Sequence, residues 1–430
     1  HNKLNDKFYI GRFMNNLQKV KKIDTLIVGA GQAGLAISEH LSNYSVEHLI
    51  LEKNRIVESW RSCRWDSLVA NGPAWHDRFP TLDFDDHSPN YFAHKAIVIS
   101  YFEKFAKKIK APIRCNVNVE EVLKDSSTKK YIVKTSEGEI EANNIVVATG
   151  AFQKPIIPSI VPNDIDITQI HSQFYRNPNQ LKEGAVLVVG SGSSGSQIAQ
   201  EIMLSGRKVF LSIGPHNRPP RRYRGKDNVW WFGALGVWQK KTPDPNTQHV
   251  TIAVSGYDGG KTIDFRKFAN QGMSLVGLTK NYENGKLYFE NNLKYNLDKG
   301  DQSYLSVLKQ ADEHIEKNNL DFPEEPDAKI IESDPDCVID PILEIDLKKE
   351  NIKTIIWATG YQYDFNWLKV DAFDAHGKPD HHRGVAKLEG IYFIGLPWLS
   401  MRGSSFIWGV WQDAKYLAEQ IVKKKDNIKN

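Results

Sequence analysis

Two segments of the chain share one pattern of apolar and polar positions. In each segment an apolar, β-branched run ends in three closely spaced glycines, and helical spacing and a second apolar run follow. Strands are expected at 25–28 and 48–51 in the first segment and at 185–189 and 208–211 in the second. A buried strand, a turn, a helix and another strand are typical of a parallel βαβ unit. The pattern therefore predicts an α/β protein with two Rossmann-like units.

The first glycine turn reads Gly29, Ala30, Gly31, Gln32, Ala33 and Gly34. The first glycine permits a tight turn, the second lets the backbone approach a pyrophosphate, and the third lets helix and strand pack closely. The pyrophosphate would lie at the helix N-terminus, where free N–H groups and the dipole favour anions. The following strand ends at Glu52, with Lys53 next to it, and a carboxylate there can accept hydrogen bonds from a ribose. We therefore expect a dinucleotide site.

The second glycine turn reads Gly190, Ser191, Gly192, Ser193, Ser194 and Gly195. Its second strand ends at Ser212 rather than at an acid, and Arg218, Arg221 and Arg222 follow. A missing acid with arginines nearby suits the 2′-phosphate of NADPH, because a carboxylate would repel the phosphate and a guanidinium pairs with it. For one or two of these arginines, a solvated basic turn remains the alternative.

Two dinucleotide sites in one chain favour FAD in the first and NADPH in the second, with hydride passing between them. Two apolar strands end in the same tripeptide, Ala-Thr-Gly, with Thr149-Gly150 in the first and Thr359-Gly360 in the second. These strand ends mark the places where the chain passes between units. The expected organisation is a leader at 1–22, an FAD-binding domain at 23–163 and 336–430, and an NADPH-binding domain at 164–335. The FAD domain is thus split by the NADPH domain.

An insertion is expected at about 220–335, because this region combines tryptophans, a glycine-rich turn and a polar, acidic stretch. It would shape a substrate cavity or serve an interface in a homodimer. The adjacent Trp230 and Trp231 are as consistent with packing as with ligand contact.

Composition excludes several classes of function. The chain has 430 residues, 40% hydrophobic and 25% charged, and a net charge of +4, which is too small to indicate a nucleic-acid partner. The three cysteines form no C-x-x-C pair, so neither a disulfide framework, a cysteine-rich zinc site nor a dithiol redox centre is expected. Sparse cysteines favour the cytoplasm. No run reaches the roughly 18 apolar residues that a membrane helix needs, so no membrane partner is expected.

Several motifs resemble those of the flavin-containing monooxygenases, most closely the bacterial and plant YUCCA-like branch. The resemblance rests on segments 51–60 with Trp60, 65–73 with Asn71, 358–361 with Tyr361, 392–395 and 409–417. Between the glycine turns, His171 and Tyr175 fit half of a family signature, whereas Ile165 and Ile167 replace its Phe and Gly.

The resemblance implies roles for individual residues. Asn71 would lie beside the reactive edge of the flavin. His171 would either position the NADPH domain as a hinge residue or act in catalysis. Arg402 would hold a substrate carboxylate or contact the polar edge of the flavin. Four further residues lie in segments expected near the flavin, namely His76, Arg78, Trp398 and Trp408.

The implied activity is an FAD- and NADPH-dependent monooxygenation. One atom of O2 would pass through a C4a-hydroperoxyflavin to a small organic substrate, by N- or S-oxygenation or by oxidation of a ketone or 2-oxo acid. One alternative is an NADPH oxidase or reductase that releases H2O2. The alternative of another class is a non-catalytic FAD-binding protein.

Overall fold

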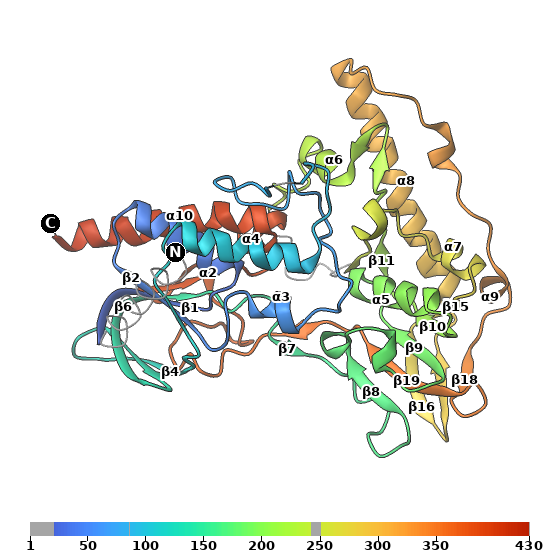
Figure 1. Cartoon of the computed structure of the whole chain (residues 1–430), viewed down its shortest axis with the longest axis horizontal. Helices are drawn as coiled ribbons and strands as arrows, with labels where there is room; N and C mark the ends of the chain where they lie inside the picture. Colours follow the sequence, from blue (N-terminus) through green and yellow to red (C-terminus); the bar gives the residue numbers. More distant parts are fainter. Residues whose placement is uncertain (1–20, 86, 242–250, 430) are drawn as a thin grey trace, which may run out of the picture.

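The computed structural model describes residues 21–85, 87–241 and 251–429. Figure 1 shows two lobes side by side, each built on its own sheet, with an arm projecting from the second. The leader expected at 1–22 lies outside the described residues except for its last two positions. Among the described residues, no helix combines the length and the apolar character needed to cross a bilayer.

The sheet of the first lobe has nine strands and is parallel at its centre. The path runs β21-β22-β23-β6-β1-β2-β3, and β4 and β5 continue from β6. Its central strands are β1 (Lys22–Val28), β2 (His48–Glu52), β3 (Ile113–Cys115), β6 (Gly138–Val147) and β23 (Ile391–Phe393). The others are β4 (Val119–Lys124), β5 (Tyr131–Thr135), β21 (His381–His382) and β22 (Val385–Ala386).

Helices cover one face of this sheet, as Figure 1 shows. They are α2 (Gln32–Asn43), α4 (Lys95–Lys108) and α10 (Ile407–Lys429), and the short α3 (Glu58–Ser62) lies beside them. Helix α2 contacts both α4 and α10. The apolar core between the helices and the sheet includes Ile27, Ile50 and Phe102, all fully buried.

The sheet of the second lobe has five strands in the order β15-β10-β9-β19-β8, all parallel. They are β8 (Thr168–His171), β9 (Ala185–Val189), β10 (Val209–Ser212), β15 (Ser274–Val276) and β19 (Ile352–Trp357). Strand β9 is buried at every position, as expected of a parallel strand covered on both faces. Helix α5 (Ser193–Leu204) follows β9.

The α/β fold class predicted from the sequence is confirmed. In both sheets the strand before the glycine turn lies between the next strand of its βαβ unit and a later strand, with β1 between β2 and β6 and β9 between β10 and β19. The expected boundary at residue 336 differs from the sheet membership. Strand β19, which ends in the second Ala-Thr-Gly, pairs with β9 and β8 of the second sheet. The chain therefore returns to the first lobe only after Gly360.

Two short strands connect the lobes. β7 (Lys154–Pro155) leads out of the first lobe, and β20 (Tyr361–Gln362) leads back. They pair antiparallel, with Tyr361 opposite Pro155. The two crossings of the chain are therefore bonded to each other.

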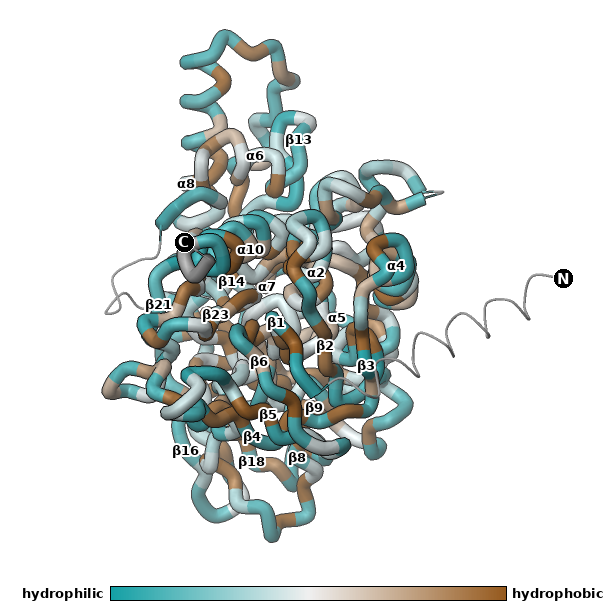
Figure 2. Tube along the Cα trace, turned by 90° about the vertical axis from the view of Figure 1, so that its left-hand side faces the viewer, coloured by the Kyte–Doolittle hydropathy of each residue, from teal (hydrophilic) through white to brown (hydrophobic). Residues whose placement is uncertain are grey.

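The predicted insertion divides between an arm built around one long helix and the second lobe. The arm contains α6 (Asn228–Ala234), the long α8 (Leu293–Asn318) and the short strands β11 (His216–Asn217), β12 (Arg222–Tyr223), β13 (Lys226–Asp227) and β14 (Thr251–Ile252). The small sheet of β16 (Thr279–Glu283), β17 (Lys286–Phe289) and β18 (Glu344–Asp346) packs on the core of the second lobe, and α7 (Phe265–Asn270) and α9 (Asp336–Ile339) contact β15 of its main sheet. Figures 1 and 2 both show the far end of α8 standing out from the body of the molecule, with α6 alongside.

A buried network of charges anchors α8 to the second lobe. Asp301 on α8 accepts from Nε of Arg218 (2.9 Å) on one side and from Arg266 on the other. Arg266 also pairs with Asp334 (3.0 Å). The side chains of Arg218 and Arg266 are each only 4% exposed. Because their charges are compensated by Asp301, this aspartate holds the base of the arm.

Replacement Asp301→Ala is expected to lower the free energy of unfolding by about 3–5 kcal/mol, since it leaves two buried cations without their shared partner. Urea denaturation at pH 7 measures the change. The control Glu313→Ala removes an exposed partner of Lys309 on the same helix and should cost less than about 1 kcal/mol. Equal effects of the two substitutions would contradict the anchoring role.

Candidate functional site

The first glycine turn forms an open cradle at the carboxyl end of β1. Gly29 has a φ of +110°, and a Cβ on Gly34 would overlap the carbonyl oxygen of Gly29. A Cβ on Gly31, by contrast, would meet nothing within 4 Å. The N-terminal N–H groups of α2, from Gln32 to Gly34, have no partner within the helix. The turn therefore leaves room and donors for a pyrophosphate, as a dinucleotide needs.

Glu52 has a structural task that the sequence did not reveal. Its Oε2 accepts from the backbone N–H of Ala30 (2.9 Å), and its Oε1 accepts from that of Asn54 (2.8 Å). A carboxylate has about four lone-pair sites, so acceptors remain for a ribose. Next to Glu52, Lys53 is exposed. Trp60 is half-buried and packs against the apolar cores of both lobes.

The second glycine turn is narrower than the first. A Cβ on Gly195 would overlap the carbonyl oxygen of Gly190, as in the first turn, but a Cβ on Gly192 would overlap the side chain of Thr251. Ser193 Oγ donates to the carbonyl of Ile252 (2.9 Å). The segment that includes β14 therefore lies along one side of the α5 N-terminus. Ser191 Oγ donates to the carbonyl of Gly214 (3.3 Å), whereas the side chain of Ser194 is exposed.

The structure does not gather the predicted 2′-phosphate residues into a free anion site. Ser212 Oγ donates to the carbonyl of Gly277 (2.8 Å). Arg218 is committed to Asp301, and Arg221 pairs with Asp227. The exposed Arg222 donates to the carbonyls of two glycines of the 256–260 turn. Because Arg218 and Arg221 form ion pairs with aspartates, Arg222 is the one of these three arginines that could turn toward a ligand without leaving a carboxylate unpaired.

Arg221 instead holds the loop that contains Asn71. Its Nη1 donates to the carbonyl of Asn71 (2.6 Å), and its guanidinium lies 4.9 Å from the ring centre of Phe92. The exposed side chain of Asn71 accepts from Nε2 of Gln197 on α5 (3.0 Å). Asn71 therefore sits on the first lobe but is fixed from the second.

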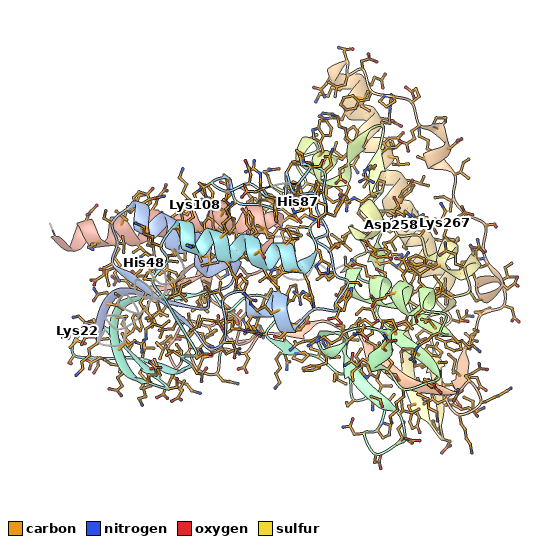
Figure 3. All side chains as sticks on the ribbon, viewed as in Figure 1. Lys22, His48, His87, Lys108, Asp258 and Lys267 are labelled. Carbon is orange, nitrogen blue, oxygen red and sulfur yellow. The ribbon has the colours of Figure 1, made fainter. Side chains whose placement is uncertain are left out.

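The lobes also meet at the glycine-rich turn of the arm. Figure 3 labels His87 and Asp258, which mark the two facing segments. A Cβ on Gly256 would overlap the carbonyl of Ala70, and a Cβ on Gly260 would come within 2.8 Å of the Phe92 ring. Glycine is thus required here by close approach between the lobes.

His171 lies at the linkers, where both ring nitrogens are occupied. Nδ1 accepts from the N–H of Gln173 (3.1 Å), and Nε2 donates to the carbonyl of Gly360 (2.9 Å). The side chain is fully buried, and burial lowers the pKa of its imidazole. The ring of Tyr361 lies 4.9 Å away, and burial raises the pKa of its phenol. With both nitrogens engaged by the backbone, the imidazole fixes the position of the linkers.

Residues of the two Ala-Thr-Gly segments also form hydrogen bonds with the linkers. Gln153 Nε2 donates to Thr149 Oγ1 (3.1 Å) and to the carbonyl of Gly150 (2.8 Å). Thr359 Oγ1 donates to the carbonyl of Ile156 (2.5 Å).

Arg402 is a half-buried cation without a carboxylate partner among the residues that the structure describes. Its guanidinium lies 5.6 Å from the ring centre of Trp398, and desolvation lowers its pKa. It begins a short 3-10 turn, Arg402–Ser405, whose last carbonyl accepts from Gln32 Nε2 of the first glycine turn (3.0 Å). An uncompensated cation beside the cradle marks a place for an anionic group.

A cleft of about 510 Å³ lies beside these elements. We call it the tryptophan cleft, and its main lining residues are Trp75, His76, Trp230, Gly233, Trp238 and Trp408. Sequence reasoning placed His76 and Trp408 near the flavin but did not join them to the tryptophans of the arm. The available signal was the clustering of tryptophans at 230–238.

Comparison with known proteins gives consistent matches. The sequence model of the pyridine nucleotide-disulphide oxidoreductases matches residues 26–226. A protein of Geobacillus kaustophilus, named uncharacterized oxidoreductase CzcO-like, is 33% identical over 404 residues, which is 93% of this chain and 98% of that relative. The probable indole-3-pyruvate monooxygenase YUCCA1 of Arabidopsis thaliana is 34% identical over 193 residues, 44% of this chain and 46% of that relative.

The fold also matches solved structures. A flavin-containing monooxygenase from Stenotrophomonas maltophilia superimposes with a TM-score of 0.64 at 16% identity, and the match covers 94% of this chain and 99% of that one. The resemblance to flavin-containing monooxygenases that the motifs indicated is confirmed.

Replacement His171→Asn is expected to lower the free energy of unfolding at pH 7.5 by about 1–3 kcal/mol, because buried backbone groups lose a partner. The histidine pKa is lower in the folded than in the unfolded chain, so the unfolded chain binds a proton more readily. Stability should therefore fall as the pH drops below about 6.5. Denaturation at pH 5.5–7.5 should show a shallower fall for His171→Asn, and a parallel fall in both proteins would contradict this assignment.

Proposed function

This chain belongs to the CzcO-like family of oxidoreductases, and from that premise we propose that it is an FAD- and NADPH-dependent monooxygenase. In this proposal the enzyme transfers one atom of O2 to a small organic substrate. FAD would occupy the first glycine cradle, and NADPH the second.

One observation carries the proposal. The two glycine turns follow β1 and β9, and each of these strands lies among parallel neighbours, between the next strand of its βαβ unit (β2 or β10) and a later strand (β6 or β19). Paired linkers join the two sheets. In such sheets, ligands bind beyond the carboxyl ends of the strands, where the strand order reverses. A chain with two such places, fixed together by Arg221 and Gln197, is suited to bring two dinucleotides into contact.

FAD, when bound, supplies the hydride acceptor and the reaction with O2. The chain's own residues then have four tasks. The α2 N-terminus binds the pyrophosphate, and Glu52 orients the ribose. Asn71 presents its amide to the reacting region, held there by Gln197 and Arg221. Arg402 binds an anionic group of a cofactor or substrate.

Oxygen is the favoured outlet for the electrons because the chain offers no dithiol relay. Cys63, Cys115 and Cys337 are all free, and no two of them form a C-x-x-C pair. Burial raises the pKa of both Cys115 and Cys337, which makes these thiols poor nucleophiles at neutral pH.

The direct experiment mixes the purified protein with NADPH, first without and then with air. We expect a yellow protein with an FAD spectrum that NADPH bleaches, and rapid mixing with O2 should give a transient species that absorbs at shorter wavelength. A flavin that NADPH does not bleach would contradict the proposal. Quantitative release of H2O2 with every candidate substrate would favour the oxidase.

Two matched glycine substitutions separate the cofactor sites. Gly34→Ala should lose FAD, because the added methyl would overlap the Gly29 carbonyl, whereas Gly195→Ala should keep FAD but lose reduction by NADPH. Circular dichroism confirms that each variant is folded, and FAD is measured by absorbance after gel filtration. Loss of FAD from Gly195→Ala, with Gly34→Ala unaffected, would reverse the assignment of the two sites.

Arg222 is the arginine we propose for the 2′-phosphate. Replacement Arg222→Ala should lower kcat/KM for NADPH at least about tenfold, the value of one charge-assisted hydrogen bond, and leave kcat/KM for NADH within twofold. The control Arg207→Ala lies beyond the other end of α5 and should change neither value. Equal losses with both nucleotides would show that Arg222 does not distinguish them.

A further inference from the structure

The tryptophan cleft lies between the two lobes' own elements. One wall comes from the loop after Asn71, with Trp75 and His76, and from Trp408 on α10. The other wall comes from the arm, with Trp230 and Gly233 on α6 and Trp238 just after it. A volume of about 510 Å³ lies within the range of small-molecule sites.

The lining of the cleft is predominantly aromatic. Ring centres of His76 and Trp408 lie 5.2 Å apart, those of Trp238 and Trp408 lie 5.5 Å apart, and those of Trp75 and His76 lie 5.5 Å apart. Aromatic rings at such distances attract further rings in edge-to-face or offset geometry, at about 0.5–1.5 kcal/mol per pair. The lining thus suits a flat aromatic ligand.

His76 supplies one oriented polar group. Its Nδ1 lies 2.7 Å from Oδ1 of Asp77, and Oδ2 of the same carboxylate accepts from the N–H of Gly72 (2.9 Å). Since a carboxylate accepts, Nδ1 is the donor, and in the tautomer that this bond selects Nε2 is the hydrogen-bond acceptor. Asp77 therefore fixes the tautomer of His76 and ties it to the residue next to Asn71.

The charges at the cleft are already compensated. Arg78, which also lines it, pairs with Asp83 (2.9 Å). Asp77 is committed to His76 and Gly72. Arg402 is not one of the lining residues, so with a neutral ligand in the cleft it is left to an anionic group of a cofactor. A ligand that brought a carboxylate or an ammonium group would therefore find no unpaired opposite charge in the lining.

We propose that the tryptophan cleft is the substrate pocket and that it takes a neutral aromatic compound with one hydroxyl or N–H group. His76 Nε2 accepts the hydrogen bond of that group, Asp77 is a positioning residue, and α6 limits the size of the ring. The claim that the bound compound is a substrate rests on the proposed function, whereas its binding to the cleft is measured independently. It gives the arm its task, which is to close the pocket over Trp408.

The test uses 2-naphthol as the probe and isothermal titration of the FAD-loaded protein. Replacement Gly233→Leu fills the cleft, and a Cβ there comes no nearer than 4.0 Å to Trp238. We expect Gly233→Leu to keep FAD and to weaken 2-naphthol binding at least tenfold. The control Ser306→Leu, at an exposed position of α8, should leave binding unchanged.

A second variant tests the hydrogen bond itself. His76→Phe should weaken 2-naphthol about tenfold and leave 2-methylnaphthalene within twofold, because the methyl compound has no donor. Asp77→Asn should weaken 2-naphthol less than His76→Phe and leave 2-methylnaphthalene within twofold, a selectivity that a merely structural role would not produce.

Several results would overturn the inference. They are equal binding of 2-naphthol and 2-methylnaphthalene to the unaltered protein, tighter binding of 2-naphthoate or trimethylphenylammonium, and loss of FAD from Gly233→Leu, which would place the flavin itself in the cleft. Normal reduction by NADPH without 2-naphthol binding contradicts this inference alone. Binding that is sensitive to Gly233→Leu, without reduction by NADPH, contradicts the proposed function alone.

Discussion

The guanidinium of Arg221 is the contact on which the candidate site depends. It is buried, paired with Asp227, and donates to the carbonyl of Asn71 on the opposite lobe (2.6 Å). Leaving a buried cation of this kind without partners costs several kcal/mol. The position of the Asn71 loop is therefore set by the second lobe, and everything that follows in that loop, including His76, inherits this position.

The sequence carried the local part of the site well. The glycine turns, the strands around them and Glu52 depend on neighbours within one βαβ unit, where periodicity and turn chemistry are decisive, whereas the closing helix α10 packs on α2 from the far end of the chain. The α/β class and the family resemblance follow from those segments. Even there, the sequence did not show that Glu52 accepts from the N–H groups of Ala30 and Asn54. Which nearby backbone groups a side chain bonds leaves no pattern in the sequence.

The sequence could not supply the partners of the arginines. Arg218 lies 83 positions from Asp301, and an arginine that compensates a buried aspartate looks the same in a sequence as one that awaits a phosphate. The strand Thr168–His171 was missed for a similar reason, since it is short and its place in the sheet depends on β19, which comes much later in the chain. The tryptophan cleft likewise joins three segments that only the folded chain brings together.

The arm has a mechanical consequence. Its base is fixed to the second lobe through Asp301, whereas the N–H groups of Arg402 and Gly403, on the first lobe, donate to the carbonyls of Lys240 (3.0 Å) and Trp238 (3.2 Å). Together with the paired linkers, the bond from Arg221 to Asn71 and the bond from Asn177 to Asp66 (2.7 Å), this ties the lobes together at more than three places among the described residues. Two bodies joined at three or more separate points cannot rotate freely against each other, so the two dinucleotide cradles are kept at a set spacing and cofactors must enter and leave without a wide swing of either half.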